Sequence, residues 1–357
     1  MIPDINNAFP LLRYYRIKLM PSPIKPNFQL VETLEKTGQV VSFSELETLV
    51  FEFENVLNKY GIKIQPGSEI EAACFSVIEV IGKFQGSVVR NPREDIRHVF
   101  SEALGIWVFL NKVVRLQNHS NFKQFIPHLA LLNKGTVVQN KRLRASEEAS
   151  NKLFELLFAL VLLDVSPDVQ LDHPSLARGN NPDILAVIDG QLWGLACKTI
   201  YGLSGKTFFD NIELGVEQIE NSAAEIGCVC VNFRNFLSHE KYWPILNDPE
   251  YHNGDEPIFG AFSDPETTIR DMIYETVIQK RDQVFQEIGY DNVMNIFAGK
   301  KALPLFLAFC HTATGKVFNI SPIPTSIISL VIGKFGEVGA QQPVFEKINL
   351  ALHERLK

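Results

Sequence analysis

Residues 181–198, NPDILAVIDGQLWGLACK, contain the turn and strand signals that decide how this chain folds. Two β-like runs lie on either side of Asp189-Gly190, a dipeptide that favours the tight turn of a β-hairpin. Counting outward from this turn places position 183 opposite position 196. We therefore predict an antiparallel hairpin in which Asp183 and Lys198 lie at the same end.

The surrounding sequence predicts the other elements of one α/β unit. A helix from about residue 146 to 163 begins with Ser146 as N-cap and early acidic residues, which suit the positive end of a helix dipole. In chain order we expect this helix, strands at 169–171, 183–188 and 192–200, a helix at 207–226 and a strand at 227–233. The order is helix, three strands, helix, strand, which indicates the α/β class.

The chain as a whole divides into three predicted regions. Residues 1–140 have the apolar periodicity of a mainly helical domain whose role no motif explains. Residues 141–235 contain the hairpin unit, and residues 236–357 are expected to form an α/β extension that completes this core or recognises a target or partner. In this last region we predict a helix at 265–288, a strand at 303–310 and a final helix at 343–356.

Composition excludes several classes of protein. Of the 357 residues, 46% are hydrophobic and 21% are charged, which is typical of a globular protein and not of a disordered or fibrous one. The net charge of −7 argues against a protein whose whole surface binds nucleic acid, but it does not exclude a local basic groove. With no secretory signal and no apolar run of ~20 residues, we expect a soluble cytoplasmic protein without a membrane partner.

The five cysteines lie mostly inside apolar runs, so we expect reduced thiols in the core of an intracellular protein. Cys228 and Cys230 form the only close pair, and they would share one face of a strand. Because no second Cys or His pair at finger-like spacing completes four ligands, the sequence does not predict a zinc site.

Glu155 is the only ionisable residue between Lys152 and Asp164. If the helix is buried there, an unpaired carboxylate would cost several kcal/mol. A metal ion, or a nearby Lys or Arg, would offset that cost. The alternative is that Glu155 lies on an exposed stripe of the helix, since acidic residues are seldom buried.

Lys198 is likewise a charged residue in an apolar segment, in this case a predicted strand. Strand geometry places Gly194, Ala196 and Lys198 on one face, among apolar or small neighbours. A lysine in such a strand is costly unless it meets an anion, and the hairpin brings Asp183 to the same end. One reading without catalysis remains open, namely an interaction protein in which Glu155 and Lys198 form a buried ion pair.

Asn181-Pro182-Asp183, followed by Ala196-Cys197-Lys198 on the second strand of a hairpin, resembles the PD-(D/E)XK nuclease superfamily, also called restriction-endonuclease-like. The resemblance covers about residues 145–233 and implies that family's core with a mixed sheet. It also implies a glutamate on the first helix, where Glu155 stands. The helix after the lysine strand often holds substrate through a Gln or Lys, and Gln218 is the matching residue.

The resemblance implies metal-dependent hydrolysis of phosphodiester bonds by a DNA endonuclease, of the restriction or anti-phage defence kind. Asp183, an acid at position 196, the backbone carbonyl of Cys197 and also Glu155 would hold Mg²⁺ or Mn²⁺, because hard cations prefer oxygen ligands. Lys198 would orient the attacking water or offset charge in the transition state. DNA is the expected partner, together with a second copy of the chain or a partner protein of a defence system.

Position 196 departs from the family pattern, because Ala196 stands where the second acid is expected. The chain is naturally degenerate, or its acid has moved to another position such as Glu155, or the sequence is an inactivated variant of a parent. We hypothesise that Ala196 is an engineered substitution of a glutamate. The alternative function is a catalytically inactive protein that keeps the nuclease fold as a nucleic-acid-binding module or scaffold.

Basic residues near the predicted core are further candidates for substrate binding. Arg142 and Arg144 precede the Glu155 helix, and Lys206 follows the Lys198 strand. Each would contact DNA phosphates if it lay beside the carboxylates. The alternative is a solvated basic turn, since charge clusters usually face water.

Overall fold

The computed structural model describes much of the chain. The described residues are 31–33, 38–39, 43–85, 95, 97–143, 145–175, 181–245, 259–318, 321–338 and 341–353.

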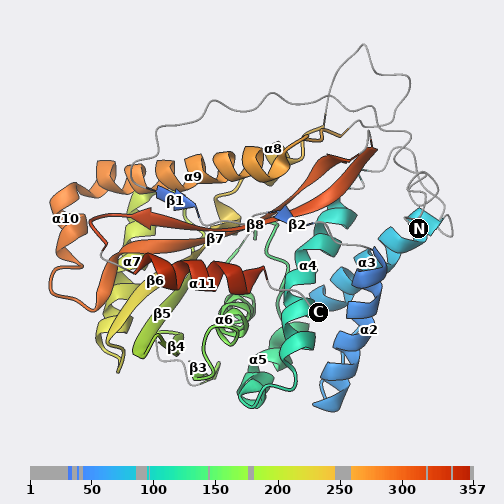
Figure 1. Ribbon diagram of the computed structural model, residues 1–357, viewed down its shortest axis with the longest axis horizontal. Coiled ribbons are helices and arrows are strands. Elements are labelled where there is room, and N and C mark those ends of the chain that lie inside the picture. The colour runs from blue at the N-terminus through green and yellow to red at the C-terminus, as the bar shows by residue number, and fades with distance from the viewer. Residues whose placement is uncertain are drawn as a thin grey trace, which may run out of the picture.

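A mixed β-sheet runs through the centre of the molecule (Figure 1). The strand order is β1-β8-β7-β6-β5-β4-β3, and β2 also pairs with β8. β5 and β6 are parallel, as are β6 and β7, whereas the other neighbours are antiparallel. The strands are β1 Val31–Thr33, β2 Gly38–Gln39, β3 Val169–Leu171, β4 Ile184–Ile188, β5 Gln191–Thr199, β6 Ile226–Asn232, β7 Ala302–Phe318 and β8 Ser321–Lys334.

The predicted hairpin is confirmed. β4 and β5 pair antiparallel with Ile188 opposite Gln191, so only Asp189 and Gly190 form the turn. Both have positive φ, 52° and 80°, which is the backbone that a two-residue type I′ turn requires. The pairing ends with Ile184 opposite Leu195, and this register brings Asp183 next to position 196.

The described helices cover both faces of the sheet. Their bounds are α2 Phe43–Lys59, α3 Glu69–Gln85, α4 Arg97–Leu116, α5 Ile126–Leu129, α6 Glu148–Leu162, α7 Gly205–Glu220, α8 His239–Tyr242, α9 Pro265–Ile288, α10 Tyr290–Asn295 and α11 Gln342–Leu352, with short 3-10 turns at Phe122–Phe125, Ala130–Asn133 and Phe233–Asn235. The predicted Ser146 cap is wrong, because Glu147 precedes the first turn of α6 and makes no capping bond with its side chain. α7 is capped instead by Ser204, whose side chain accepts a hydrogen bond from the Thr207 amide.

Two hydrophobic cores lie on opposite faces of the sheet, and alternate residues of β5 enter different ones. Leu195 packs in the core shared with α2, α3, α4, α6 and α11, whereas Ala196 packs in the core shared with α7 and α9. In Figure 1, α9 runs along one face of the sheet and α6 and α11 along the other. The molecule is therefore an α/β protein with helical layers on both sides of a mixed sheet.

β7 and β8 form a long hairpin that continues the sheet beyond β6. The sequence predicted a strand at 303–310 but no strand at 321–334. Pro322 and Pro324 explain the omission, because proline is depleted in strands and favours loops. Once β7 is in place, backbone pairing outweighs this local preference.

No described helix is long and apolar enough to cross a membrane.

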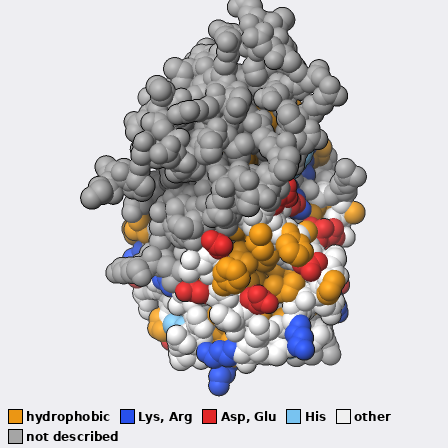
Figure 2. All heavy atoms as spheres, turned by 90° about the vertical axis from the view of Figure 1, so that its right-hand side faces the viewer, with side chains coloured by type: hydrophobic (Ala, Val, Ile, Leu, Met, Phe, Trp, Pro, Cys, Tyr) orange, Lys and Arg blue, Asp and Glu red, His pale blue; other side chains and the backbone are white. Residues whose placement is uncertain are grey.

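Exposed hydrophobic side chains gather on the face of the molecule that Figure 2 shows, where acidic side chains border them. α2 and α3, on that side of the molecule in Figure 1, expose Phe51, Phe75 and Ile78 by 56%, 57% and 49%. Exposed apolar clusters of this kind are typical of protein contact surfaces.

Candidate functional site

Asp183 immediately precedes β4, where the hairpin pairing ends. Its Oδ2 accepts a hydrogen bond from the Cys197 amide at 2.8 Å, so the carboxylate continues the pairing beyond Ile184 and Leu195. Its backbone carbonyl accepts a second bond, from the Asp172 amide at 2.9 Å. These contacts fix the carboxylate beside the 196–198 segment of β5.

Lys152 and Glu155 approach this carboxylate from α6. Their i,i+3 spacing places both side chains on one side of the helix, with Lys152 Nζ 2.8 Å from Glu155 Oε2. The same Nζ lies 3.6 Å from Asp183 Oδ1. One ammonium therefore bridges two carboxylates that come from different elements.

All three charged groups are largely withdrawn from water. The side chains of Lys152, Glu155 and Asp183 are only 11%, 7% and 10% exposed. When all are ionised, two negative charges face one positive charge. The predicted burial of Glu155 is confirmed, and its exposed alternative is wrong.

Burial and the neighbouring Asp183 carboxylate raise the pKa of Glu155 well above its ordinary value, although Lys152 partly opposes this shift. Burial alone would lower the pKa of Lys152. The carboxylates of Glu155 and Asp183, with a smaller contribution from Asp172, instead raise that pKa. The cluster thus favours a protonated Glu155 and a charged Lys152 in the absence of another cation.

The raised pKa of Glu155 predicts how stability depends on pH in metal-free buffer. Unfolded chains release the Glu155 proton near pH 4.5, whereas the folded protein retains it to higher pH. The folded state therefore binds more protons above pH 4.5, so this residue makes the free energy of unfolding fall as pH rises through that window. Glu155→Gln should flatten the fall, as measured by urea unfolding at a series of pH values. If the pH dependence of the free energy of unfolding were unchanged in this variant, the pKa of Glu155 would not be raised in the folded protein.

Lys198 lies on the other face of β5, where its Nζ donates a hydrogen bond to Gln218 Oε1 on α7. Among the described residues, no hydrogen bond or ion pair joins Lys198 to Asp183 or Glu155. The charges of all three nevertheless act on the Cys197 thiol, whose pKa burial raises. Glu155 therefore pairs with Lys152, and the buried Glu155–Lys198 ion pair considered above is not formed.

Ala196 is fully buried beneath α7. Gly215 lies so close that a Cβ atom there would be 2.7 Å from Val229 and 3.3 Å from the Cβ of Ala196. This close packing accommodates the small side chain of Ala196, which has no carboxylate. Glu155 is the acid that the structure places beside Asp183.

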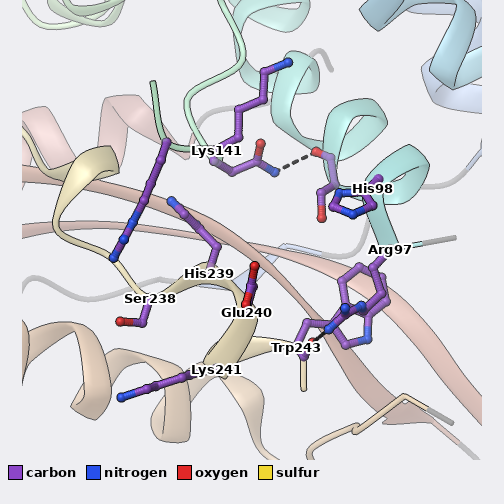
Figure 3. A pocket seen from close by; sticks show the side chains of 11 residues that line it. Arg97, His98, Lys141, Ser238, His239, Glu240, Lys241 and Trp243 are labelled. Atoms are coloured by element: carbon purple, nitrogen blue, oxygen red, sulfur yellow. Dashed lines mark hydrogen bonds between the residues drawn. The ribbon is translucent and has the colours of Figure 1, made fainter. Parts of the chain in front are cut away.

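The basic candidates do not gather at the carboxylates. Arg142 is exposed, donates from Nε to the Leu237 carbonyl at 3.0 Å, and lines a separate pocket (Figure 3). Lys206 is also exposed and pairs with Asp210 at 2.9 Å. Arg144 lies outside the described residues.

A magnesium ion was expected at this site, so the donors must be compared with what the ion requires. Within the described part of the chain, no three His, Cys, Asp or Glu side chains cluster as metal ligands. Mg²⁺, however, is often held by one or two carboxylates, with water and substrate phosphate completing its shell. Asp183 and Glu155 meet that requirement, and relief of their mutual repulsion would favour a cation there.

Two residues near the site were missed in the sequence. Lys152 could have been found from its i,i+3 spacing to Glu155. No sequence pattern pointed to His128, which comes from α5 and on which the charge of Lys152 acts. It is 1% exposed, and neither ring nitrogen has a hydrogen-bond partner among the described residues. Burial, with the charges of Lys152 and His173, lowers its pKa to about 3, so this imidazole is neutral.

Comparison of the chain with protein-family models, curated proteins and solved structures finds no match. Function must therefore be inferred from the side chains that the fold brings together.

Proposed function

We propose that this chain is a metal-dependent nuclease that hydrolyses phosphodiester bonds of DNA. The observation that carries the proposal is the pair of buried carboxylates, Asp183 and Glu155, held together at the end of a β-hairpin. Paired carboxylates are suited to a divalent cation that binds phosphate. Lys198 and Gln218 form a polar pair on the other face of β5.

The order of elements supports a restriction-endonuclease-like core. α6, β3, β4, β5, α7 and β6 follow one another as helix, three-stranded meander, helix and strand. β5 and β6 are parallel and joined through α7, while β3, β4 and β5 are antiparallel. This is the arrangement that the resemblance in residues 145–233 implies.

The proposed mechanism assigns a separate task to each residue. Asp183, Glu155 and the Cys197 carbonyl would hold Mg²⁺, which when bound polarises the phosphate and lowers the pKa of a bound water. The Cys197 amide keeps the Asp183 carboxylate in place. Lys198 orients the attacking water or stabilises negative charge on the phosphorane-like transition state. Gln218 keeps the Lys198 ammonium beside the strand until substrate arrives.

Lys198→Ala should lower the rate of cleavage by roughly 100-fold, the usual contribution of one preorganised electrostatic group. DNA affinity should change little, since the lysine acts on the transition state. Plasmid cleavage under single-turnover conditions and DNA binding in Ca²⁺ measure the two quantities. Lys347→Ala is the control, because Lys347 is an exposed lysine that pairs with Asp189 in the hairpin turn. Equal rates for the two variants would remove Lys198 from the mechanism.

A catalytically inactive nucleic-acid-binding protein is the second candidate, and two observations favour it. Ala196 supplies no acid at the second position of the motif. Lys152 already neutralises part of the charge that a metal ion would neutralise. A protein of this kind would keep the fold and bind nucleic acid without turnover.

Incubation of the purified chain with supercoiled plasmid, linear duplex and single-stranded RNA decides between the two candidates. Nicked or linear products with Mg²⁺ or Mn²⁺, and none with EDTA, would support the nuclease. Retarded migration of intact DNA in the presence of either metal would support the binding protein. Neither cleavage nor binding would reject both.

A further inference from the structure

A pocket of about 410 Å³ lies between the start of α4 and the short helix α8, and the residues of the carboxylate site do not line it. In Figure 3, His239 and Glu240 of α8 lie across the pocket from Arg97 and His98 of α4, whereas the Lys241 side chain extends away from those two residues. Its size is within the range of pockets that bind small molecules. The lining includes Arg97, Lys141, Arg142, Ser238, Lys241 and Trp243.

Two of the cations that line this pocket are already neutralised. Arg97 pairs with Asp95 at 2.6 Å. Lys141 pairs with Glu102 at 2.8 Å and with Glu69 at 3.3 Å. These residues hold the walls together, and their charges are largely balanced.

Arg142 and Lys241 are not neutralised in this way. Arg142 uses only Nε, toward the Leu237 carbonyl, so its two terminal nitrogens have no partner among the described residues. The Lys241 ammonium makes no hydrogen bond or ion pair with any described side chain. Glu240 is the one acidic residue that lines the pocket.

Arg234 adds a third positive charge behind the pocket wall. Its side chain is 1% exposed; Nε donates to the Lys141 carbonyl at 2.8 Å, whereas Nη2 has no partner. No carboxylate in the described ranges forms an ion pair with it, and burial lowers its pKa to about 10. The charges of Tyr201, Glu147 and Glu69 oppose this shift only in part, and a buried charge that lacks a paired counter-ion costs several kcal/mol.

His239 lines the pocket and contacts Arg234, whose charge affects the pKa of the imidazole. Its Nε2 is 3.0 Å from the Arg234 carbonyl oxygen, and its Nδ1 is 3.1 Å from Thr312 Oγ1. Burial, with smaller contributions from the charges of Arg234 and Arg142, lowers the pKa of His239 to about 4, although the contact with the Arg234 carbonyl opposes this shift. The imidazole is therefore neutral and adds no charge to the pocket lining.

We infer that this pocket binds a small molecule through a phosphate group, with Arg142 and Lys241 as its direct contacts. A guanidinium with two free terminal nitrogens matches two phosphate oxygens, and an ammonium supplies a third donor. The anion would also offset the buried charge of Arg234. Glu240 also lines the pocket, and its negative charge disfavours a long polyanion such as DNA.

Isothermal titration of the full chain with inorganic phosphate, AMP and a short DNA duplex tests the inference. We expect phosphate or AMP to bind, and Arg142→Gln or Lys241→Gln to weaken that binding by about tenfold, as for loss of a charge-assisted hydrogen bond. Lys123→Gln is the control, an exposed lysine beyond the far end of the 20-residue α4, ~30 Å away. It should bind as the unchanged protein does.

Three results would overturn the inference. Phosphate and AMP could fail to bind, or they could bind all variants equally. Binding of the duplex alone, lost in Arg142→Gln, would instead make this surface part of a nucleic-acid interface. Circular dichroism of each variant checks folding, which these exposed positions should not disturb.

Discussion

Asp183→Asn should reduce metal-dependent DNA cleavage by at least about 100-fold, since even the outer partners of metal ligands contribute 10- to 100-fold. Asparagine has nearly the shape of aspartate, and its Oδ1 still accepts the hydrogen bond from the Cys197 amide. The fold should therefore persist, while the negative charge that would hold the cation is lost. Initial rates of plasmid nicking in Mg²⁺ and in Mn²⁺ measure the effect.

Asp189→Asn is the matched control for this prediction. Asp189 belongs to the same hairpin but lies in its exposed turn with φ of 52°, a conformation that asparagine adopts readily. This variant should cleave at the rate of the unchanged chain. If Asp183→Asn also cleaved at that rate, the carboxylate would have no part in the reaction. If Asp189→Asn lost activity as well, the hairpin and not the charge would be responsible.

Lys152→Met should lower the free energy of unfolding in EDTA by about 3–5 kcal/mol, the usual cost of removing one partner from a buried ion pair. The substitution leaves the carboxylates of Glu155 and Asp183 close together without their shared ammonium. Mg²⁺ should restore part of the loss, because a divalent cation would neutralise the same two groups. Urea unfolding with EDTA and with Mg²⁺ measures both effects.

Two further variants make this result specific. Lys206→Met breaks an exposed pair with Asp210 and should cost no more than about 1 kcal/mol. The double variant Lys152→Met, Glu155→Gln also replaces the acid that Lys152 contacts with a neutral amide, so it should recover much of the stability that Lys152→Met loses. If Lys152→Met lowered the free energy of unfolding as little as Lys206→Met does, the buried Lys152 ammonium would contribute no more to stability than an exposed ion pair does. If Mg²⁺ gave no recovery, the carboxylates would not bind the ion.

Local patterns predicted the part of the site that belongs to the hairpin. The turn at Asp189-Gly190 determined the register, and register alone brings Asp183 to positions 196–198. Strand alternation likewise placed Ala196 and Lys198 on one face of β5, where both contact α7. These inferences succeeded because they depend on contacts between residues close in the sequence.

Contacts between distant elements were not predictable in the same way. Lys152 was passed over because its partnership with Asp183 depends on how α6 packs against the sheet. Arg142, expected near the carboxylates, instead lies in the pocket beside α8, where it contacts Leu237. β8 was missed because its prolines favour loops, although pairing with β7 makes it a strand.

The sequence by itself determined the α/β order of helix, hairpin, helix and strand, and it located Asp183 and Lys198 through the register of one turn. Short-range geometry suffices for this, because a two-residue turn leaves a single pairing. Only the tertiary structure decided that Glu155 is buried beside Asp183 and that Lys152, not Lys198, is its basic partner. The physical reason is that α6 adopts its place through the apolar core, and this packing determines which charges must share a site without water.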